Sequence, residues 1–81
     1  MAYKIRVYVN HKPVGFVRWL LDQENGLRES LLATNISKAT RFDSSPAGLK
    51  DIALAMTDMK EPERETVKGL GPKLTFQLIN V

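Results

Sequence analysis

Residues 38–59, KATRFDSSPAGLKDIALAMTDM, contain a β-type segment, a helix-start signal and an amphipathic helix in succession. Ser45 can accept a backbone N–H as the N-cap, and Pro46 suits the first helical position. Apolar residues then recur with the i, i+3, i+4, i+7 spacing of one buried stripe, namely Leu49, Ile52, Ala53 and Met56. The opposite, outward side would carry Lys50, Asp51, Thr57 and Asp58. The stretch therefore predicts a helix that packs across a sheet.

Period-two alternation at both ends of the chain predicts half-buried strands over residues 3–9 and 74–81. In the first strand, Tyr3, Ile5, Val7 and Val9 would point to one face, and Lys4, Arg6 and Tyr8 to the other. In the last strand, Leu74, Phe76 and Leu78 alternate against Thr75, Gln77 and Ile79. Each strand therefore has one apolar face for the helix to cover.

The segment between these ends predicts two further strands. Residues 11–15, HKPVG, are typical of a turn, and Phe16 to Leu21 forms the return strand. Its apolar residues on both faces indicate a central strand or one that a partner covers. Asp22 to Gly26 is a second turn. Leu27 to Ala33 could be helix or strand, and we favour a third strand. Thr34 would then cap one helical turn over residues 35–39 that returns Arg41 and Phe42 to the sheet.

The predicted element order is β-β-(β)-α-β in a single domain over residues 1–81. The fold class is α+β: a small antiparallel sheet of three to four strands with one helix packed on one face. A charged connector, Lys60 to Lys73, joins the helix to the last strand, and a short helix opened by Pro62 and ended by Gly69 is one option for it.

Composition limits where the chain acts and what it binds. The formal net charge is +3, and the whole excess lies in residues 1–40, which is weak for a dedicated nucleic-acid binder. No cysteine is present, so disulfides and thiolate metal sites are excluded. The start MAYKIRVYVN lacks the apolar run of a signal peptide, and no stretch approaches the roughly 20 apolar residues of a membrane span. We expect a cytoplasmic protein.

Catalytic and cofactor motifs are missing from the sequence. His11 is the one histidine, and we interpret it as a solvated turn residue because no nucleophile accompanies it. The acids at positions 58–65 are interleaved with basic residues, as on a solvated segment, and lack a calcium-loop pattern. Gly69-Leu70-Gly71 lacks the third glycine of a dinucleotide loop. We predict no enzyme activity, no metal and no cofactor.

The sheet face away from the helix carries the most informative group of residues. Cations and aromatic rings would be interleaved there: Lys4, Arg6, Tyr8, Phe16 and Arg18. Such a face can bind single-stranded nucleic acid by base stacking and phosphate neutralisation. It can equally form a protein interface, in which Tyr, Phe and Arg are enriched, or it can be simply solvated. The modest net charge favours protein over nucleic acid.

A group of residues in the middle of the chain covers about a quarter of it, namely Thr34, Ala39, Arg41-Phe42, Asp43-Ser44, Ala47 and Ile52-Ala53. There, a sheet segment ending A-x-R-F leads into a capped helix. This pattern resembles small hypothetical proteins of bacteriophages and prophages of Gram-positive bacteria. The resemblance implies an accessory phage protein in a host cytoplasm, of a kind that often binds and blocks a host component such as a defence nuclease.

The sequence therefore predicts a non-enzymatic, phage-type accessory protein that acts as a protein-interaction module, with Lys4, Arg6, Tyr8, Phe16 and Arg18 as the candidate partner-binding residues. Its partner would be a host or phage protein, a second copy of itself, or both. The second copy is included because so small a core favours self-association. The alternative is a weak single-stranded nucleic-acid binder that uses the same face.

Overall fold

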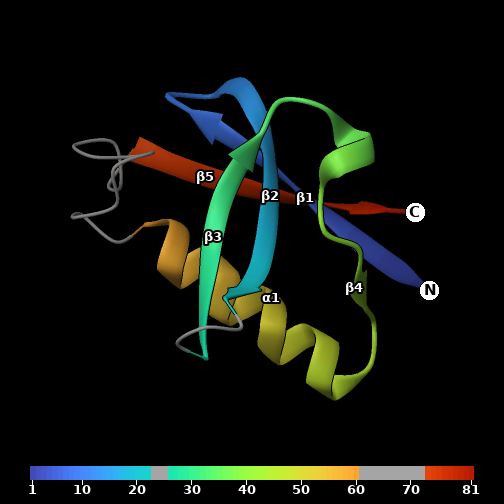
Figure 1. Cartoon of the computed structure of the whole chain (residues 1–81). Helices are drawn as coiled ribbons and strands as arrows, with labels where there is room; N and C mark the ends of the chain where they lie inside the picture. Colours follow the sequence, from blue (N-terminus) through green and yellow to red (C-terminus); the bar gives the residue numbers. More distant parts are fainter. Residues whose placement is uncertain (23–25, 61–72) are drawn as a thin grey trace.

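The computed structural model describes residues 1–22, 26–60 and 73–81 (Figure 1). Its elements are β1 (Ala2–Val9), β2 (Lys12–Asp22), β3 (Leu27–Ala33), the 3-10 turn η1 (Ile36–Lys38), β4 (Phe42–Asp43), α1 (Pro46–Met59) and β5 (Leu74–Asn80). This confirms the α+β class and the assignment of residues 27–33 as a strand. The connector helix predicted from Pro62 to Gly69 lies outside the described residues, as do positions 23–25 of the second turn. None of the described helices is long and apolar enough to cross a membrane.

Strand β1 is the centre of an antiparallel sheet. Residues 3–9 pair with β5 along its whole length, and residues 6–9 pair with β2, which in turn pairs with β3. Tyr3 pairs with Asn80 on one side and with Phe42 of β4 on the other, so β4 lies on the β2 side of β1. In the described part of the chain, β3, β4 and β5 each pair with a single strand and so form edges of the sheet (Figure 1).

Thr40 fills the gap where β1 and β2 diverge. Its backbone N–H donates to the Val17 carbonyl oxygen at 3.1 Å. Its Oγ1 accepts the Trp19 N–H at 2.7 Å and lies 3.3 Å from the Trp19 carbonyl oxygen, to which it donates. The side chain of Thr40 thereby supplies the partners that a neighbouring strand would otherwise give β2. This bridge was not foreseen from the sequence.

The first hairpin turn lies earlier than predicted. Asn10 (φ 50°) and His11 (φ 67°) form a two-residue turn with the left-handed backbone that tight hairpins require, so the prediction of a turn over residues 11–15 is wrong. β2 already begins at Lys12, and Pro13 lies inside it. The pairing shifts between Val7 and Tyr8, and this bulge accommodates the proline, which cannot donate to the ladder.

Gly15 is fixed by a close approach of β3. A Cβ at this position would lie 2.5 Å from the Ala33 carbonyl oxygen and 3.0 Å from a methyl group of Leu32. No side chain fits there. The glycine predicted to end a turn therefore lets two strands come together.

The start of α1 follows the prediction, but its buried stripe does not. The Gly48 N–H donates to the Ser45 hydroxyl at 3.2 Å, which confirms Ser45 as the N-cap, and Pro46 is the first helical residue. The buried helix residues are Gly48, Ile52, Ala55 and Met59. Leu49 is 47% exposed and Ala53 is exposed, so the predicted stripe of Leu49, Ile52, Ala53 and Met56 is wrong at these two positions. It is correct at Ile52, and Met56 is half-buried and packs against the core.

Contacts with β3 and β4 explain this rotation of the helix. Gly48 packs so closely on the Asp43 backbone that no Cβ fits. Farther along, Ser30 donates from its hydroxyl to the Ala55 carbonyl oxygen at 2.9 Å and from its backbone N–H to the Asp58 carboxylate at 2.8 Å. Asp58 was predicted on the outward side, and this too is wrong. The helix is turned toward β3 by these polar contacts.

The core lies between α1 and the middle of the sheet. It consists of Ile5, Val7, Val17, Phe42, Ile52, Ala55, Met59 and Leu74. The Trp19 ring packs against it and stacks on Phe42 with the ring centroids 6.1 Å apart. One side of the sheet is therefore covered and apolar, as the alternation in β1 and β5 predicts.

The turn between β3 and β4 has a different cap from the predicted one. The Asn35 side chain accepts the Ser37 N–H at 3.0 Å, so Asn35 and not Thr34 is the N-cap of η1. An Asn side chain two residues before the donor closes such a turn more readily than Thr three residues before it. The turn still returns Phe42 to the sheet, where it is 3% exposed, whereas Arg41 stays exposed.

Candidate functional site

The five predicted site residues lie on the side of the sheet opposite α1. Ile5, Val7 and Val17 belong to the core beneath the helix, and side chains alternate along a strand. Lys4, Arg6 and Tyr8 of β1 and Phe16 and Arg18 of β2 therefore share the other side. We call this side the open face; with the neighbouring strands it comprises Lys4, Arg6, Tyr8, Phe16, Arg18, Leu20, Glu29, Leu31, Thr75, Gln77 and Ile79.

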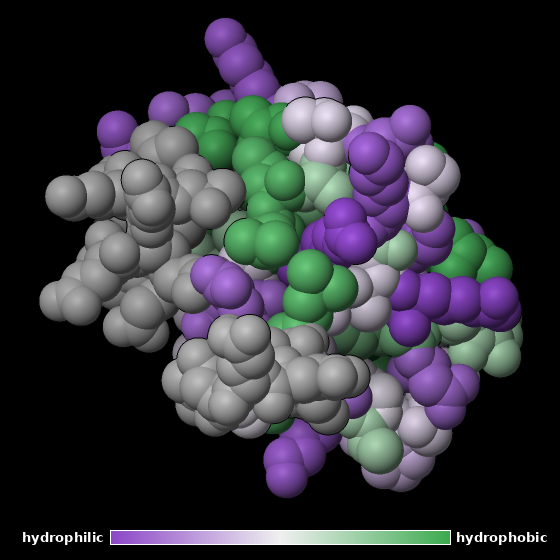
Figure 2. Space-filling view, in the orientation of Figure 1, coloured by the Kyte–Doolittle hydropathy of each residue, from purple (hydrophilic) through white to green (hydrophobic). Residues whose placement is uncertain are grey.

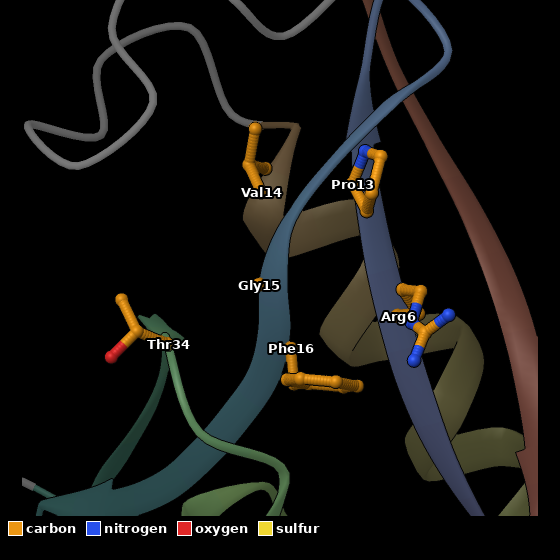
Figure 3. Close-up of a pocket in the computed structure, with 6 residues that line it drawn as sticks. All are labelled: Arg6, Pro13, Val14, Gly15, Phe16 and Thr34. Carbon is orange, nitrogen blue, oxygen red and sulfur yellow. The ribbon is translucent and has the colours of Figure 1, made fainter.

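Arg6 and Phe16 form the best-defined contact on the open face. They are directly opposite each other in the β1–β2 ladder, and the Arg6 guanidinium lies over the Phe16 ring, 5.3 Å from its centroid. Figure 3 shows the two side chains close together. Such a cation–π contact holds the guanidinium in one place, with donors still available to a binding partner.

A pocket of about 340 Å³ lies beside this pair. Its lining residues come from the bulged part of β2, from β1 and from the residue that follows β3: Arg6, Pro13, Val14, Gly15, Phe16 and Thr34 (Figure 3). About half of this lining is apolar, and Arg6 brings the one charge. A partner that presents an apolar side chain next to a carboxylate would complement both the apolar part of the lining and the charge of Arg6.

Apolar side chains are also exposed along β2. Figure 2 shows a green band over the C-terminal end of β3, with hydrophilic side chains beside it. Val14 is 38% exposed and Leu20 is 40% exposed. The open face is therefore a mixture of apolar area and cations rather than a uniformly charged surface.

Tyr8 is held in place by the last strand. Its hydroxyl donates to the Gln77 Oε1 at 2.6 Å, and a second pocket of about 300 Å³ lies there, lined by Tyr8, His11, Thr75, Phe76 and Gln77. His11 is exposed in the hairpin turn, as expected for a turn histidine. The Tyr8 side chain is therefore held across β1 and β5 by Gln77, the residue opposite Arg6 in the β1–β5 ladder.

Lys4 has a structural partner. Its ammonium group donates to the Ile36 carbonyl oxygen at 2.8 Å and so fastens η1 to the sheet. Arg18, in contrast, is exposed and pairs across the ladder with Leu31. The structure thus brings Arg6 and Phe16 together, ties Tyr8 and Lys4 to other segments, and leaves Arg18 in solvent.

The neighbouring strands β3 and β5 contribute residues to the open face that were not predicted from the sequence. Gln77 of β5 and Leu31 of β3 lie on the open face because their registers place them opposite Arg6 and Arg18. Period-two alternation would have given each residue its side, but only the strand order shows which residues are neighbours. Among the described side chains of this face, Glu29 is the single acid, against Lys4, Arg6 and Arg18.

The start of α1 is occupied by its own side chains. Asp43 accepts the Ser45 N–H at 3.4 Å, and hydrogen bonds from the Ser45 hydroxyl and backbone lower the pKa of the Asp43 carboxyl from its ordinary value of 3.8. Ser45 in turn accepts from Gly48. These contacts use donors that an anion would need, so we do not assign a binding role to the helix start.

The chain matches no protein-family model, no curated protein and no solved structure. The open face is therefore interpreted from its own geometry.

Proposed function

We propose that this chain is a non-enzymatic protein-interaction module that binds its partner through the open face. The observation that supports this most is the Arg6–Phe16 contact beside a pocket of mixed polar and apolar lining. Arginine and aromatic side chains are among the residues that dominate protein interfaces. The partner surface would present carboxylates next to apolar side chains.

Charge supports an acidic partner. The described open face carries Lys4, Arg6 and Arg18 against Glu29 alone, and complementary charge steers association and selects the partner. Because Lys4 already donates to Ile36, Arg6 and Arg18 would make the main ionic contacts.

A more specific proposal follows from the resemblance to phage and prophage proteins. The chain would act in a host cytoplasm and block a host component such as a defence nuclease. Many nucleases hold their catalytic metal ions with carboxylates. An acidic surface of that kind would complement the cations of the open face.

Single-stranded nucleic acid is the weaker candidate for the same face. Base stacking needs an aromatic ring with a free side. One side of the Phe16 ring is taken by the Arg6 guanidinium, and the Tyr8 hydroxyl is bound to Gln77. Neither contact favours a stacking platform.

Retention experiments with two matched variants test the proposal. Immobilised protein would be exposed to nuclease-treated cytosol of the bacterial host, and the retained proteins identified by mass spectrometry. Arg6→Glu combined with Arg18→Glu should abolish retention while the chain stays folded, because it reverses the two charges that would make the main ionic contacts. Lys50→Glu, at an exposed position of α1, is the control and should retain the same protein.

Two results would contradict this function. Equal retention by the folded double variant would exclude the open face as the binding surface. Binding of a single-stranded oligonucleotide that weakens steeply as salt rises, without any retained protein, would favour the nucleic-acid alternative instead.

A further inference from the structure

The outer edge of strand β5 offers a second surface, separate from the Arg6–Phe16 contact. It pairs with β1 through seven successive residue pairs, from Tyr3 with Asn80 to Val9 with Leu74. In the described part of the chain, no strand pairs with its other edge. The backbone groups along that edge can therefore pair with another strand.

Two hydrogen bonds establish which backbone groups point outward. The Val81 N–H donates to the Ala2 carbonyl oxygen at 3.0 Å, and the Asn10 N–H donates to the Lys73 carbonyl oxygen at 3.3 Å. These two bonds show that the odd-numbered residues of the last segment, such as Lys73 and Val81, point their N–H and C=O groups toward β1. Since hydrogen-bonded pairs alternate in an antiparallel ladder, the N–H and C=O groups that point away from β1 belong to Leu74, Phe76, Leu78 and Asn80.

The edge of β5 lacks the features that usually keep strand edges apart. Residues 74–80, LTFQLIN, contain no charge and no proline, and their pairing with β1 shows no bulge. Protected edges typically carry a lysine, a proline or a bulge. Leu78 is also 44% exposed, so apolar surface accompanies the free backbone groups.

We propose that β5 pairs in antiparallel fashion with β5 of a second copy of this chain, about a twofold axis that passes Gln77. Leu74 then faces Asn80 of the other copy, and Phe76 faces Leu78. All four outward-pointing residues are in hydrogen-bonded pairs, and the sheets of the two copies join into one.

The register follows from the pattern of the strand. A shift by one residue would place outward-pointing groups opposite inward-pointing ones, and a shift by two would leave residues unpaired at the ends. Only the register centred on Gln77 pairs all seven residues of β5. It also sets Phe76 against Leu78 and the β-branched Thr75 against Ile79, which are favourable cross-strand pairs, and it opposes no like charges.

Self-complementarity is the argument for a second copy rather than another protein. A twofold contact uses the same patch twice, so each residue pair must also work in reverse. β5 meets this condition without a charged or bulky residue at the axis. The pairing uses the outer edge of β5 and not Arg6, Phe16 or Arg18, so the proposed function and this pairing can fail separately.

Single cysteines test the register directly, because the natural chain contains none. Gln77→Cys would bring two Cα atoms to about 4.5 Å across the axis, and oxidised glutathione should convert the folded variant to a disulfide-linked dimer. Thr75→Cys is the matched control on the same strand and face. Its two copies would lie about 14 Å apart and should stay unlinked. Equal cross-linking of both variants would overturn the proposal.

The mass in solution tests the pairing without a cross-link. Light scattering over a concentration series should give a dimer for the natural chain and a monomer for Leu78→Pro, which removes an outward-pointing donor but no bond to β1. Leu78→Lys, which places a charge at the edge, should have the same effect and covers the case in which the proline variant does not fold. A monomer at every concentration, or a dimer mass that Leu78→Lys leaves unchanged, would show the proposal to be wrong.

Discussion

The hydroxyl of Ser30 on β3 donates a hydrogen bond to the carbonyl oxygen of Ala55 in α1, at a distance of 2.9 Å. Ser30 is 1% exposed and is the one polar residue that is buried among the described core positions. Its backbone N–H donates to Asp58 on the same helix. This polar attachment joins an edge strand to the helix in a place where alternation alone would expect an apolar residue.

Ser30→Ala should therefore destabilise the fold although it removes only one oxygen atom. Loss of a buried hydrogen bond typically costs about 1–2 kcal/mol. The comparison is Ser37→Ala in η1, an exposed serine whose replacement should change stability little. Urea unfolding followed by circular dichroism measures both. If the two variants unfolded at the same urea concentration, the Ser30 hydroxyl would have no role in holding α1.

Gly48→Ala should also destabilise the protein, against the usual trend for helices. Alanine in place of glycine normally stabilises a helix interior by about 1 kcal/mol. Here the added Cβ would lie 2.6 Å from the Asp43 carbonyl carbon, and overpacking of this kind typically costs about 1–3 kcal/mol. We expect a lower Tm. At the exposed position 53, Ala53→Gly should follow normal propensity and cost about 1 kcal/mol. A rise in the Tm of Gly48→Ala would refute the close packing of α1 on β4.

The same contact explains how far the fold could be predicted. Local signals were sufficient for the elements: alternation gave β1 and β5, and Ser45 with Pro46 gave the start of α1. The face that α1 buries was predicted from hydropathy, which ranks Leu49 above Gly48. Long-range packing of Gly48 on Asp43 and of Ala55 near Ser30 decides otherwise, and neither contact has a local sequence signature.

The candidate site could also be predicted only in part from local sequence. Alternation put Arg6, Phe16 and Arg18 on one face, because a strand has only two sides. Whether Arg6 meets Phe16 depends on the β1–β2 register, and this register rests on a turn at Asn10 that was predicted one residue too late. The hydrogen bond from the Lys4 ammonium group to the Ile36 carbonyl oxygen depends on the path of the whole connection between β3 and β4.

The Asp43 carboxyl should make stability depend on acid pH. Hydrogen bonds from Ser45 lower its pKa below 3.8 in the folded chain, so its contribution is present above that value and is lost as the pH falls through the lowered pKa. Asp43→Asn should lower the Tm at neutral pH, with the difference from the natural chain vanishing in acid. In Ser45→Ala, NMR titration should show the Asp43 pKa moving back up. An unchanged titration would mean that Ser45 does not cause the shift.

Thr40→Val tests the side chain that bridges the gap beside β2. Valine has nearly the same shape but leaves the Trp19 N–H without the partner that lies 2.7 Å away. An unsatisfied, partly buried donor costs about 1–3 kcal/mol. Thr57→Val, at an exposed threonine of α1, is the control and should have a much smaller effect. Thermal unfolding of the two variants gives the comparison, and equal Tm values would argue against the bridge.

A double-mutant cycle on Arg6 and Phe16 measures the contact on which the proposed binding face depends. The cycle compares Arg6→Ala, Phe16→Ala and the double variant with the natural chain. The stabilities should be non-additive by about 0.5–1 kcal/mol, as expected for a cation–π pair at an accessible site. Arg18 lies on the same face without a contact to Arg6 in the described structure, so a cycle of Arg6 with Arg18 should be additive. If the Arg6–Phe16 cycle were additive as well, the guanidinium would not be held by the ring, and the open face would lose the fixed anchor beside its pocket.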